Sequence, residues 1–414
     1  MYARGRGAGR GAPRVRAGAP RAGACTSSSG RFPRDSHGTG NSTEVAGSWS
    51  LNSSSPQESP MSVQPTAASP SPSATAPASA SGSLPEKLAA VHQIRRPRGA
   101  PVPEDFAFVT EPMPEPLPGT ALVENTWLSV DPYMRENMDG EWELHAPLEG
   151  RALGRVVASA DPALPEGSLV LHRQGWRTHA AVTAAEARVL PDLPGTAQES
   201  FLGILGGTGL TAYVALTRIA ALRSGEDVFV SAAAGGVGSA AGQLARLLGA
   251  RRVVGSAGTR AKADWLVAEL GFDAAFVHRD GPVAEQLAAA APDGVDVVVD
   301  NVGGDHLEAA IGALRERGRI AWAGAISQYN AASPPATPRN LFDLVEKSGR
   351  LEGFLVSRHR DAQGELEAFL TPHLRQGTVR DPLTVTEGFG HVVDAFLGML
   401  RGANTGKAVV RVAS

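Results

Sequence analysis

The stretch "SAAAGGVGSAAGQLARLLGARRVVGSAG", residues 231–258, constrains the fold more than any other part of the chain. It follows the apolar run 227–231 and is typical of a glycine-rich turn, a helix and a second strand. In a nucleotide-binding turn, the second glycine lets the backbone approach a pyrophosphate and the third lets the helix pack on the strand. Gly235 and Gly238 take these two positions, while Ala233 stands where the first glycine would be. The pattern predicts a dinucleotide-binding unit, and the alternative is a turn whose small residues serve packing only.

The end of the second strand indicates which dinucleotide this unit binds. Sites for NAD place Asp or Glu about 20 residues after the turn, where the carboxylate binds the ribose 2′-hydroxyl. Here residues 255–258 are Gly-Ser-Ala-Gly, and the cations Arg260 and Lys262 follow. A carboxylate would repel a 2′-phosphate, whereas cations attract it. We therefore expect NADPH as the cofactor, unless the two cations only form the solvated face of a helix.

Strand and helix patterns alternate through the second half of the chain. Candidate strands lie at 227–232, 251–256, 273–278, 295–302, 319–324 and 352–357, and candidate helices at 237–249, 260–271, 282–291 and 306–318. Most of these strands are continuous apolar runs, as parallel strands buried on both faces are. This order predicts an α/β fold with a doubly wound parallel sheet. The segment before it has short alternating runs bounded by Pro and Gly, which predicts a β-rich region.

The first 85 residues differ in composition from the rest. They are rich in Arg, Gly and Ala and then in Ser, Pro, Ala and Thr, with little apolar material to offset the entropy of ordering. We predict that residues 1–85 are a disordered, low-complexity tail. The alternatives are an organelle transit peptide and upstream sequence that precedes a true start at Met61.

Charge and cysteine content exclude several classes of protein. The net charge is −3, but residues 1–40 hold eight Arg and one acidic residue, which leaves the remainder near −10. Such a remainder is not a nucleic-acid-binding body. The single cysteine, Cys25, excludes an intramolecular disulfide and a cysteine-rich zinc site. No apolar run approaches the roughly 20 residues of a membrane span, so we expect no membrane partner and a cytoplasmic location, or an organelle if the start is a transit peptide.

Several motifs outside the glycine turn resemble one family. They are "NTWLSVDPYMRENM" (125–138), "GLTAYVAL" (209–216), "KADWLVAELGFDAA" (262–275), "DNVGG" (300–304), "GAISQYN" (324–330) and "GANTGKAVV" (402–410). From about residue 86 onward, the chain resembles the zinc-independent medium-chain dehydrogenases/reductases of the prostaglandin reductase, leukotriene B4 dehydrogenase and curcumin reductase group. Two departures stand out. Gly207 and Thr208 replace the frequent Met-Pro, and His278 stands where many relatives have Tyr against the cofactor.

The resemblance implies a domain organisation and an activity. A GroES-like β-rich domain would occupy residues 86–205 and 378–414, with a Rossmann NADP-binding domain inserted over 206–377. The implied reaction is the NADPH-dependent reduction of a C=C bond conjugated to a carbonyl, in a homodimer that acts on a small α,β-unsaturated carbonyl compound. Two alternatives stay open: an NADPH quinone reductase of the same superfamily, and a non-catalytic NADP-binding protein.

The resemblance also implies which residues bind the cofactor. Gly238 and its neighbours would hold the pyrophosphate, Lys262 the 2′-phosphate, and Ala325 would lie near the nicotinamide. The whole predicted cofactor set is Gly235, Gly236, Val237, Gly238, Ser239, Lys262, His278, Asn301, Gly324, Ala325, Phe354 and Asn404.

The chemistry of an enone reduction indicates the candidate catalytic residues. Hydride attack on the β-carbon moves negative charge onto the carbonyl oxygen, which then needs a stabilising donor. Without cysteines for zinc, a hydroxyl can serve, so we predict Tyr329 as the main donor and Tyr133 as a second residue of the substrate site. Each tyrosine could instead be a wall residue whose hydroxyl is satisfied elsewhere. His172, His179 and His306 show no ligand spacing, so we expect them at the surface, with no metal site and activity that survives chelation.

Overall fold

The structure is a computed structural model that describes residues 84–331, 333 and 337–412. The predicted tail lies outside these residues, apart from Leu84 and Pro85, and Cys25 lies outside them as well. The described residues belong to one compact unit, Ala80–Ser414. Within this unit, the strands form a parallel sheet, a mixed sheet and a hairpin.

The parallel sheet is the doubly wound sheet predicted from the sequence. Its strand order is β10-β9-β8-β11-β12-β13, and every neighbouring pair is parallel. The strands are β8 (Asp227–Val230), β9 (Arg252–Ala257), β10 (Ala274–Val277), β11 (Val295–Asp300), β12 (Leu314–Trp322) and β13 (Arg350–Gly353). The main helices between them are α3 (Gly236–Leu247), α4 (Arg260–Leu270), α5 (Val283–Ala290) and α6 (Gly304–Ala313).

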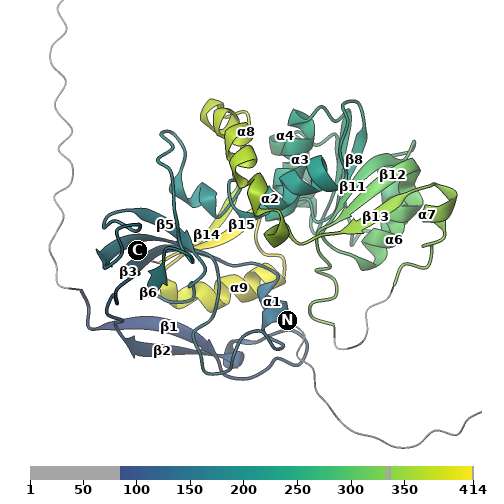
Figure 1. Ribbon diagram of the computed structural model, residues 1–414. Helices are drawn as coiled ribbons and strands as arrows, with labels where there is room; N and C mark the ends of the chain where they lie inside the picture. The colour runs from purple at the N-terminus through teal and green to yellow at the C-terminus, as the bar shows by residue number, and fades with distance from the viewer. Residues whose placement is uncertain (1–83, 332, 334–336, 413–414) are drawn as a thin grey trace, which may run out of the picture. The chain divides into compact units, whose positions relative to one another are not determined.

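Alternate residues of β8 show why helices cover both faces of this sheet. Val228 and Val230 pack in one apolar cluster with residues of α3 and α4, while Phe229 packs in another with residues of α5 and α6. Figure 1 shows α3 and α4 on one side of the sheet and α6 on the other. A strand buried on both faces needs consecutive apolar residues, which is the pattern of residues 228–230 of β8.

The mixed sheet joins two distant parts of the sequence. Its order is β14-β15-β3-β4-β5-β7, and β6 also pairs with β3. The strands are β3 (Thr120–Ser129), β4 (Ala152–Ser159), β5 (Leu169–His172), β6 (His179–Thr183), β7 (Arg188–Val189), β14 (Leu383–Glu387) and β15 (Lys407–Arg411). Because β15 returns from the C-terminal end to pair antiparallel with β3, the parallel sheet is an insertion in the β-rich part. The predicted fold class is therefore confirmed.

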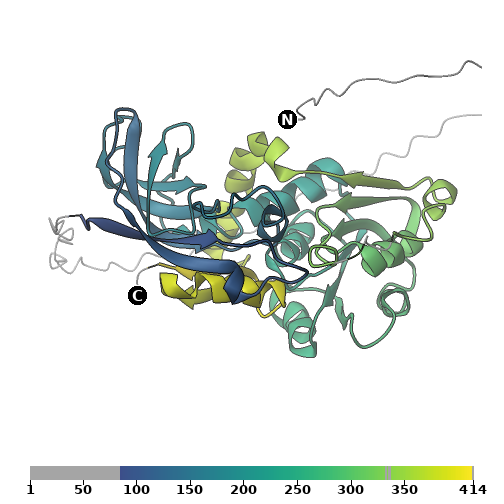
Figure 2. The ribbon, with the colours of Figure 1, turned by 90° about the horizontal axis from the view of Figure 1, so that it is seen from below.

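The first described strands and a C-terminal helix complete this β-rich part. Strands β1 (Lys87–Gln93) and β2 (Phe106–Pro112) form an antiparallel hairpin. Phe106 of β2 stacks with Trp176 and meets Phe396 of α9 (Val392–Leu400) edge to face. Figure 2 shows α9 running beside the first strands of the chain. Two further helices are α2 (Gly207–Val214) and α8 (Gln363–Gln376), and two short ones are α1 (Met134–Asn137) and α7 (Asp343–Glu346).

Two predicted boundaries are wrong. The helix expected over 306–318 ends at Ala313, and residues 314–318 instead begin β12. Leu, Arg and Glu in that stretch favour a helix, but pairing of Leu314 with Val295 of β11 overrides this local preference. The strand expected over 352–357 ends at Gly353 and is followed by short 3₁₀ turns.

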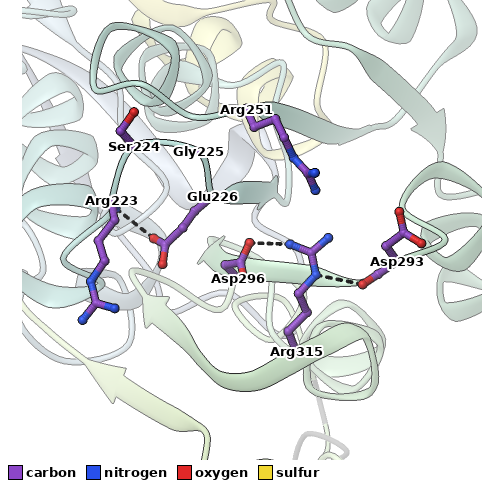
Figure 3. A pocket seen from close by; sticks show the side chains of 8 residues that line it. All are labelled: Arg223, Ser224, Gly225, Glu226, Arg251, Asp293, Asp296 and Arg315. Atoms are coloured by element: carbon purple, nitrogen blue, oxygen red, sulfur yellow. Dashed lines mark hydrogen bonds and ion pairs between the residues drawn. The ribbon is translucent and has the colours of Figure 1, made fainter. Parts of the chain in front are cut away.

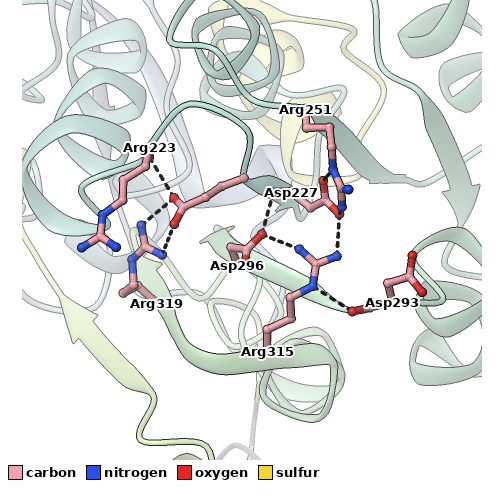
Figure 4. A network of polar contacts seen from close by, with 8 residues as sticks. Arg223, Asp227, Arg251, Asp293, Asp296, Arg315 and Arg319 are labelled. Atoms are coloured by element: carbon pink, nitrogen blue, oxygen red, sulfur yellow. Dashed lines mark hydrogen bonds and ion pairs between the residues drawn. The ribbon is translucent and has the colours of Figure 1, made fainter. Parts of the chain in front are cut away.

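An ion network closes the amino end of the parallel sheet. Asp227, whose side chain is 5% exposed, accepts hydrogen bonds from Arg251 at 2.8 and 2.6 Å and from Arg315 at 2.7 Å. Arg315 also pairs with Asp296, as Figure 4 shows. Burial alone would raise the pKa of Asp227, but the hydrogen bonds from the two arginines lower it.

Three residues of this network, Arg251, Asp296 and Arg315, also line a surface hollow of about 630 Å³, drawn in Figure 3. Asp227, Asp296 and Arg315 belong to the amino ends of β8, β11 and β12. Ligands of open parallel sheets bind at the carboxyl ends of the strands. The network therefore holds the strands together, and a ligand site is expected at the opposite edge of the sheet.

Among the described residues, none of the helices has the length and apolar character needed to cross a membrane.

Candidate active site

The glycine turn lies at the carboxyl end of β8, where α3 begins. Gly235 is the N-cap of α3, and no side chain of the described residues caps this helix end. The first backbone N–H groups of a helix have no intrahelical partner, and the helix dipole favours an anion there. A Cβ on Gly238 would lie 2.4 Å from the Ala232 carbonyl oxygen and 2.6 Å from the Ala233 Cα, so only glycine lets the helix pack this closely. These features fit a pyrophosphate.

Two further residues of the predicted turn have packing contacts. Ser239 is 2% exposed, and its hydroxyl donates to the Gly236 carbonyl at 3.2 Å. Val237 packs against the core that α3 shares with the sheet. Both therefore shape the turn, and their contacts agree with the prediction that this segment holds the cofactor by its backbone.

Lys262 lies in the first turn of α4, the helix that follows β9. Thr259 caps this helix by accepting from the Lys262 backbone N–H. The Lys262 ammonium donates to the carbonyls of Gly402 and Asn404 at 2.7 and 2.6 Å. An ammonium has three hydrogens, so one stays available for a 2′-phosphate. Burial, and then the nearby Arg279, lowers the pKa of Lys262.

The C-terminal loop reaches the glycine turn directly. The Asn404 side-chain amide donates to the Gly406 carbonyl at 2.7 Å, and the Gly406 N–H donates to the Ala234 carbonyl at 2.8 Å. Gly235 and Gly406 form an isolated parallel bridge. The predicted residues Lys262 and Asn404, far apart in sequence, thus lie together beside the turn.

His278 follows β10 and lies beside the end of β9. Its Nδ1 donates to the Ala257 carbonyl at 2.9 Å, because a carbonyl oxygen can only accept. A Cβ on Gly258 would lie 3.8 Å from the His278 ring. The ring of His306 meets His278 edge to face at 5.3 Å. The structure therefore places His278 where the second strand ends, next to the predicted ribose site.

The prediction that three histidines lie at the surface is wrong. His172, His179 and His306 are 1%, 8% and 6% exposed. Both ring nitrogens of His172 have hydrogen-bond partners within the protein. Its Nε2 donates to the Asn125 side chain at 2.8 Å, and its Nδ1 accepts from a backbone N–H at 3.1 Å. Burial lowers the pKa of His172 to about 3 and, with the neighbouring His278, that of His306 to about 4. No group of three metal-binding side chains occurs in the described parts of the chain.

The ends of β8 and β11 are tied together by a polar cluster that the sequence motifs did not reveal. Asp300 is fully buried and accepts from the Ser231 hydroxyl at 2.6 Å. Its carboxylate also accepts from the backbone N–H groups of residues 302 and 303. The Asn301 amide donates to the Ser231 carbonyl at 2.9 Å, which leaves the Asn301 side-chain oxygen as an acceptor. This cluster holds Asn301 at the point where the strand order reverses, the usual place for a cofactor.

The segment after β12 lies against the one after β11. A Cβ on Gly303 would lie 3.4 Å from the Ala325 Cβ, and one on Gly324 would lie 3.4 Å from the Asn301 carbonyl oxygen. Phe354, which follows β13, donates its backbone N–H to the Trp322 carbonyl at 3.4 Å. The predicted residues Asn301, Gly324 and Ala325 are therefore neighbours, and Phe354 stands after the adjoining strand.

Tyr329 lies in this segment and faces α1. A Cβ on Gly324 would be 3.4 Å from its hydroxyl. Burial, and then the Glu136 carboxylate that accepts a hydrogen bond from the phenol, raises the pKa of Tyr329, so the phenol is protonated at neutral pH. A second contact joins the same regions, because Arg135 donates to the Asn330 side chain at 3.2 Å. Glu136 was not predicted, and its place in "DPYMRE" offers no signal without the fold.

Tyr133 precedes α1 and lies in a charged environment. Its hydroxyl is buried and has no hydrogen-bond partner among the described residues. The guanidinium carbons of Arg151 and Arg173 each lie 5.9 Å from the centre of its ring. Burial, and then the nearby Asp131, raises the pKa of Tyr133. An unpartnered buried hydroxyl carries an energetic cost unless a ligand satisfies it.

A buried ion pair that the sequence did not predict joins the β-rich part to the cofactor turn. The Lys407 ammonium lies 3.1 Å from the Asp131 carboxylate and also donates to the carbonyls of Val130 and Ala408. A Cβ on Gly236 would lie 3.4 Å from Lys407. In the sequence, Asp131 and Lys407 stand in two separate family-like motifs, residues 125–138 and 402–410, and nothing there indicated that they would pair.

The parallel sheet carries a Rossmann-type cofactor turn and is inserted into a β-rich domain, and protonated phenols lie nearby. This combination is typical of a nucleotide-dependent oxidoreductase of the medium-chain type. The chain matches the family described as the N-terminal domain of oxidoreductase over residues 90–190, and the zinc-binding dehydrogenase family over residues 236–371. It is 41% identical to YfmJ of Bacillus subtilis over 77% of this chain and 96% of that one. It is 40% identical to prostaglandin reductase 1 of Bos taurus over 76% and 95% of the two chains.

A solved structure agrees with these relatives. The crystal structure of CurA from Vibrio vulnificus in complex with NADPH is 32% identical and aligns with a TM-score of 0.74, over 79% of this chain and 99% of that chain. The chain belongs to the medium-chain dehydrogenase/reductase family, in the NADP-dependent group that contains the prostaglandin reductases. The resemblance inferred from the motifs is confirmed.

Proposed function

We propose that the protein is an NADPH-dependent reductase of the C=C bond of α,β-unsaturated carbonyl compounds. One observation carries the proposal: the glycine turn before α3 and the protonated phenol of Tyr329 lie at the same edge of the sheet. The strand β9, which ends at that edge, has no carboxylate at its end. The relatives support it by name, since they include an NADPH-dependent curcumin reductase of Escherichia coli and a 2-alkenal reductase of Nicotiana tabacum.

The chain's own residues have distinct parts in this reaction. NADPH, when bound, supplies the hydride that adds to the β-carbon. The α3 N-terminus and Lys262 would hold its phosphates, with Asn301 beside the reacting end. Tyr329 would donate a hydrogen bond to the carbonyl oxygen, where negative charge develops as the β-carbon is reduced. A proton from water then reaches the α-carbon, which completes the saturated carbonyl product.

We further propose that the enzyme is a cytoplasmic homodimer. The dimer proposal rests on β13, which pairs with β12 on one side and forms an outer edge of the parallel sheet. Near this edge four apolar side chains are 47–69% exposed: Leu341, Phe342, Val345 and Leu355. An open strand edge beside apolar side chains favours pairing with a second copy. The cytoplasmic location stays a prediction from the sequence, and fluorescence microscopy of the tagged full chain checks it.

The function is tested by following NADPH oxidation with a panel of enals, enones and quinones and identifying the products. We expect saturated carbonyl products from enals and enones. Turnover of quinones alone would instead favour the quinone reductase alternative. NADPH binding without turnover of any compound would favour the non-catalytic alternative.

A further inference from the structure

Arg151 and Gly207 form a complementary pair in this chain. Arg151 directly precedes β4, and Gly207 is the first residue of α2. A Cβ on Gly207 would lie 2.6 Å from the guanidinium carbon of Arg151 and 2.7 and 2.8 Å from its terminal nitrogens. The guanidinium therefore occupies the space that any side chain at position 207 would need. Gly207 is one of the two departures from the family motif, so its absent side chain admits a cation.

The positive charge of Arg151 is poorly compensated. Within the part of the chain that the structure describes, its guanidinium makes no hydrogen bond, although its side chain is only 23% exposed. The nearest carboxylate, Asp131, lies 3.8 Å away and already binds Lys407 at 3.1 Å and the Ser129 hydroxyl at 2.5 Å. A half-buried guanidinium usually binds oxygen atoms through several of its five N–H groups.

The two acids nearest to Arg151 have closer cationic partners. Arg173 pairs with Glu149, and Lys407 lies nearer to Asp131 than Arg151 does. Arg151 lies over the ring of Tyr133, whose hydroxyl is the unpartnered one described above. The Arg151 guanidinium and the Tyr133 hydroxyl are therefore neighbouring hydrogen-bond donors without a hydrogen-bond partner among the described residues.

This place lies between the predicted substrate site and the cofactor turn. Thr208 follows Gly207 in α2, and a Cβ on Gly236 of the turn would lie 3.0 Å from the Thr208 methyl group. Tyr133, on the other side of Arg151, precedes α1, whose Glu136 faces Tyr329. A substrate held at Tyr329 and Tyr133 would therefore have Arg151 within its reach.

We propose that Arg151 is a specificity-determining residue that binds an anionic group of the substrate, so that the preferred substrates are enals and enones that carry a carboxylate. The proposal rests on the reductase function above and adds the substrate class. Arg presents parallel N–H groups that match a carboxylate, and the Tyr133 hydroxyl can donate a further hydrogen bond. Among the described residues, Asp131 and Glu149 both have a closer cationic partner than Arg151, so the Arg151 N–H groups are available to a substrate carboxylate.

The test compares 7-oxooct-5-enoate with its methyl ester, which differ in charge but share the reacting enone. The measured quantity is the ratio of kcat/KM for the carboxylate to kcat/KM for the ester. Four forms are compared: the parent, Arg151→Gln, Gly207→Ala and the double variant. Arg218→Gln, which removes a surface ion pair with Asp361 and Glu365, is the control.

We expect the ratio to exceed one in the parent and to fall about tenfold or more in Arg151→Gln, as for the loss of a charge-assisted hydrogen bond. Gly207→Ala keeps the charge but moves the flexible guanidinium, and alanine favours a helix, so the fold tolerates it. It should lower the ratio similarly, and the double variant should lower it no further, because both changes remove one interaction. The control should keep the parent's ratio.

An unchanged ratio in Arg151→Gln, with the ester still reduced, would overturn the inference and leave the reductase function standing. A constant ratio together with a raised Kd for NADPH, measured by nucleotide fluorescence, would mean that Arg151 serves the cofactor phosphates, and this too overturns it. If the parent reduces neither compound nor any other enone, the proposed function itself fails.

Discussion

At the scale of single residues, the site depends on groups whose protonation the fold controls. Tyr329 is buried next to Glu136, and both features raise its pKa above the ordinary value of 10.0. A phenol in this state is a hydrogen-bond donor throughout the neutral range. A tyrosine of ordinary pKa is also protonated at neutral pH, so the environment extends the protonated range of Tyr329 to higher pH.

Replacement of Tyr329 by Phe should lower kcat about tenfold or more and leave NADPH affinity nearly unchanged. The substitution removes one donor to the developing oxyanion and no group assigned to the cofactor. Steady-state kinetics on an enone that the parent reduces measures the effect. A normal kcat with a raised KM for NADPH would mean that Tyr329 is part of the cofactor wall and would contradict the mechanism.

Replacement of Lys262 by Ala should raise the KM for NADPH and leave NADH kinetics nearly unchanged. Loss of a charge-assisted bond to the 2′-phosphate costs about 1–3 kcal/mol, or roughly 5- to 150-fold. NADH lacks that phosphate and is the matched control. Lys262 also binds the carbonyls of Gly402 and Asn404, so an equal loss with both cofactors would assign it to loop support instead.

At the scale of elements, a buried carboxyl couples the segment before α2 to the segment before β14. Asp381 accepts from the Ile204 backbone N–H at 3.0 Å, and its second oxygen has no partner among the described residues. The Gly203 backbone packs so closely that a Cβ there would lie 2.4 Å from this carboxylate. Burial raises the pKa of Asp381 from 3.8 to about 6.

The raised pKa predicts a pH-dependent effect of Asp381→Asn. The folded protein holds this proton more tightly than the unfolded chain, so the contribution of Asp381 to stability falls as pH rises from about 4 to about 6. The Asn variant lacks this loss. Its free energy of unfolding relative to the parent should therefore increase over that window, on the order of 2–3 kcal/mol, and level off above it.

Urea denaturation of the two proteins between pH 4 and pH 7 measures this difference. Glu316→Gln, at an exposed carboxyl, is the control and should show no such trend. A difference between Asp381→Asn and the parent that does not change with pH would contradict the prediction.

At the scale of the whole molecule, the outer edge of the parallel sheet governs assembly. Phe342 and Leu355, 69% and 61% exposed, accompany the open edge of β13. We expect a dimer at micromolar concentration, and we expect Phe342→Glu combined with Leu355→Glu to produce a monomer because like charges would meet across the interface. Size-exclusion chromatography with light scattering distinguishes the two. A monomeric parent would contradict the homodimer proposal.

Local pattern was sufficient for the doubly wound sheet and the cofactor turn. Continuous apolar runs mark strands buried on both faces, and the spacing of Gly235 and Gly238 specifies a close turn, because both signals lie within a few residues of the structure they describe. The missing carboxylate after β9 is likewise a local signal. Position and periodicity along the chain therefore determined the fold class, the cofactor turn and the predicted preference for NADPH.

Only the tertiary structure decided which distant residues meet. Residues 314–318 have helical character but pair with β11, and His172, His179 and His306 are buried despite their polarity. Lys407 pairs with Asp131, and Arg151 fills the space left by Gly207, across gaps that no sequence period spans. Such contacts depend on how separate elements pack, where burial and long-range pairing outweigh local preference. The environment of the two tyrosines, and with it the chemistry of the site, was set at this level.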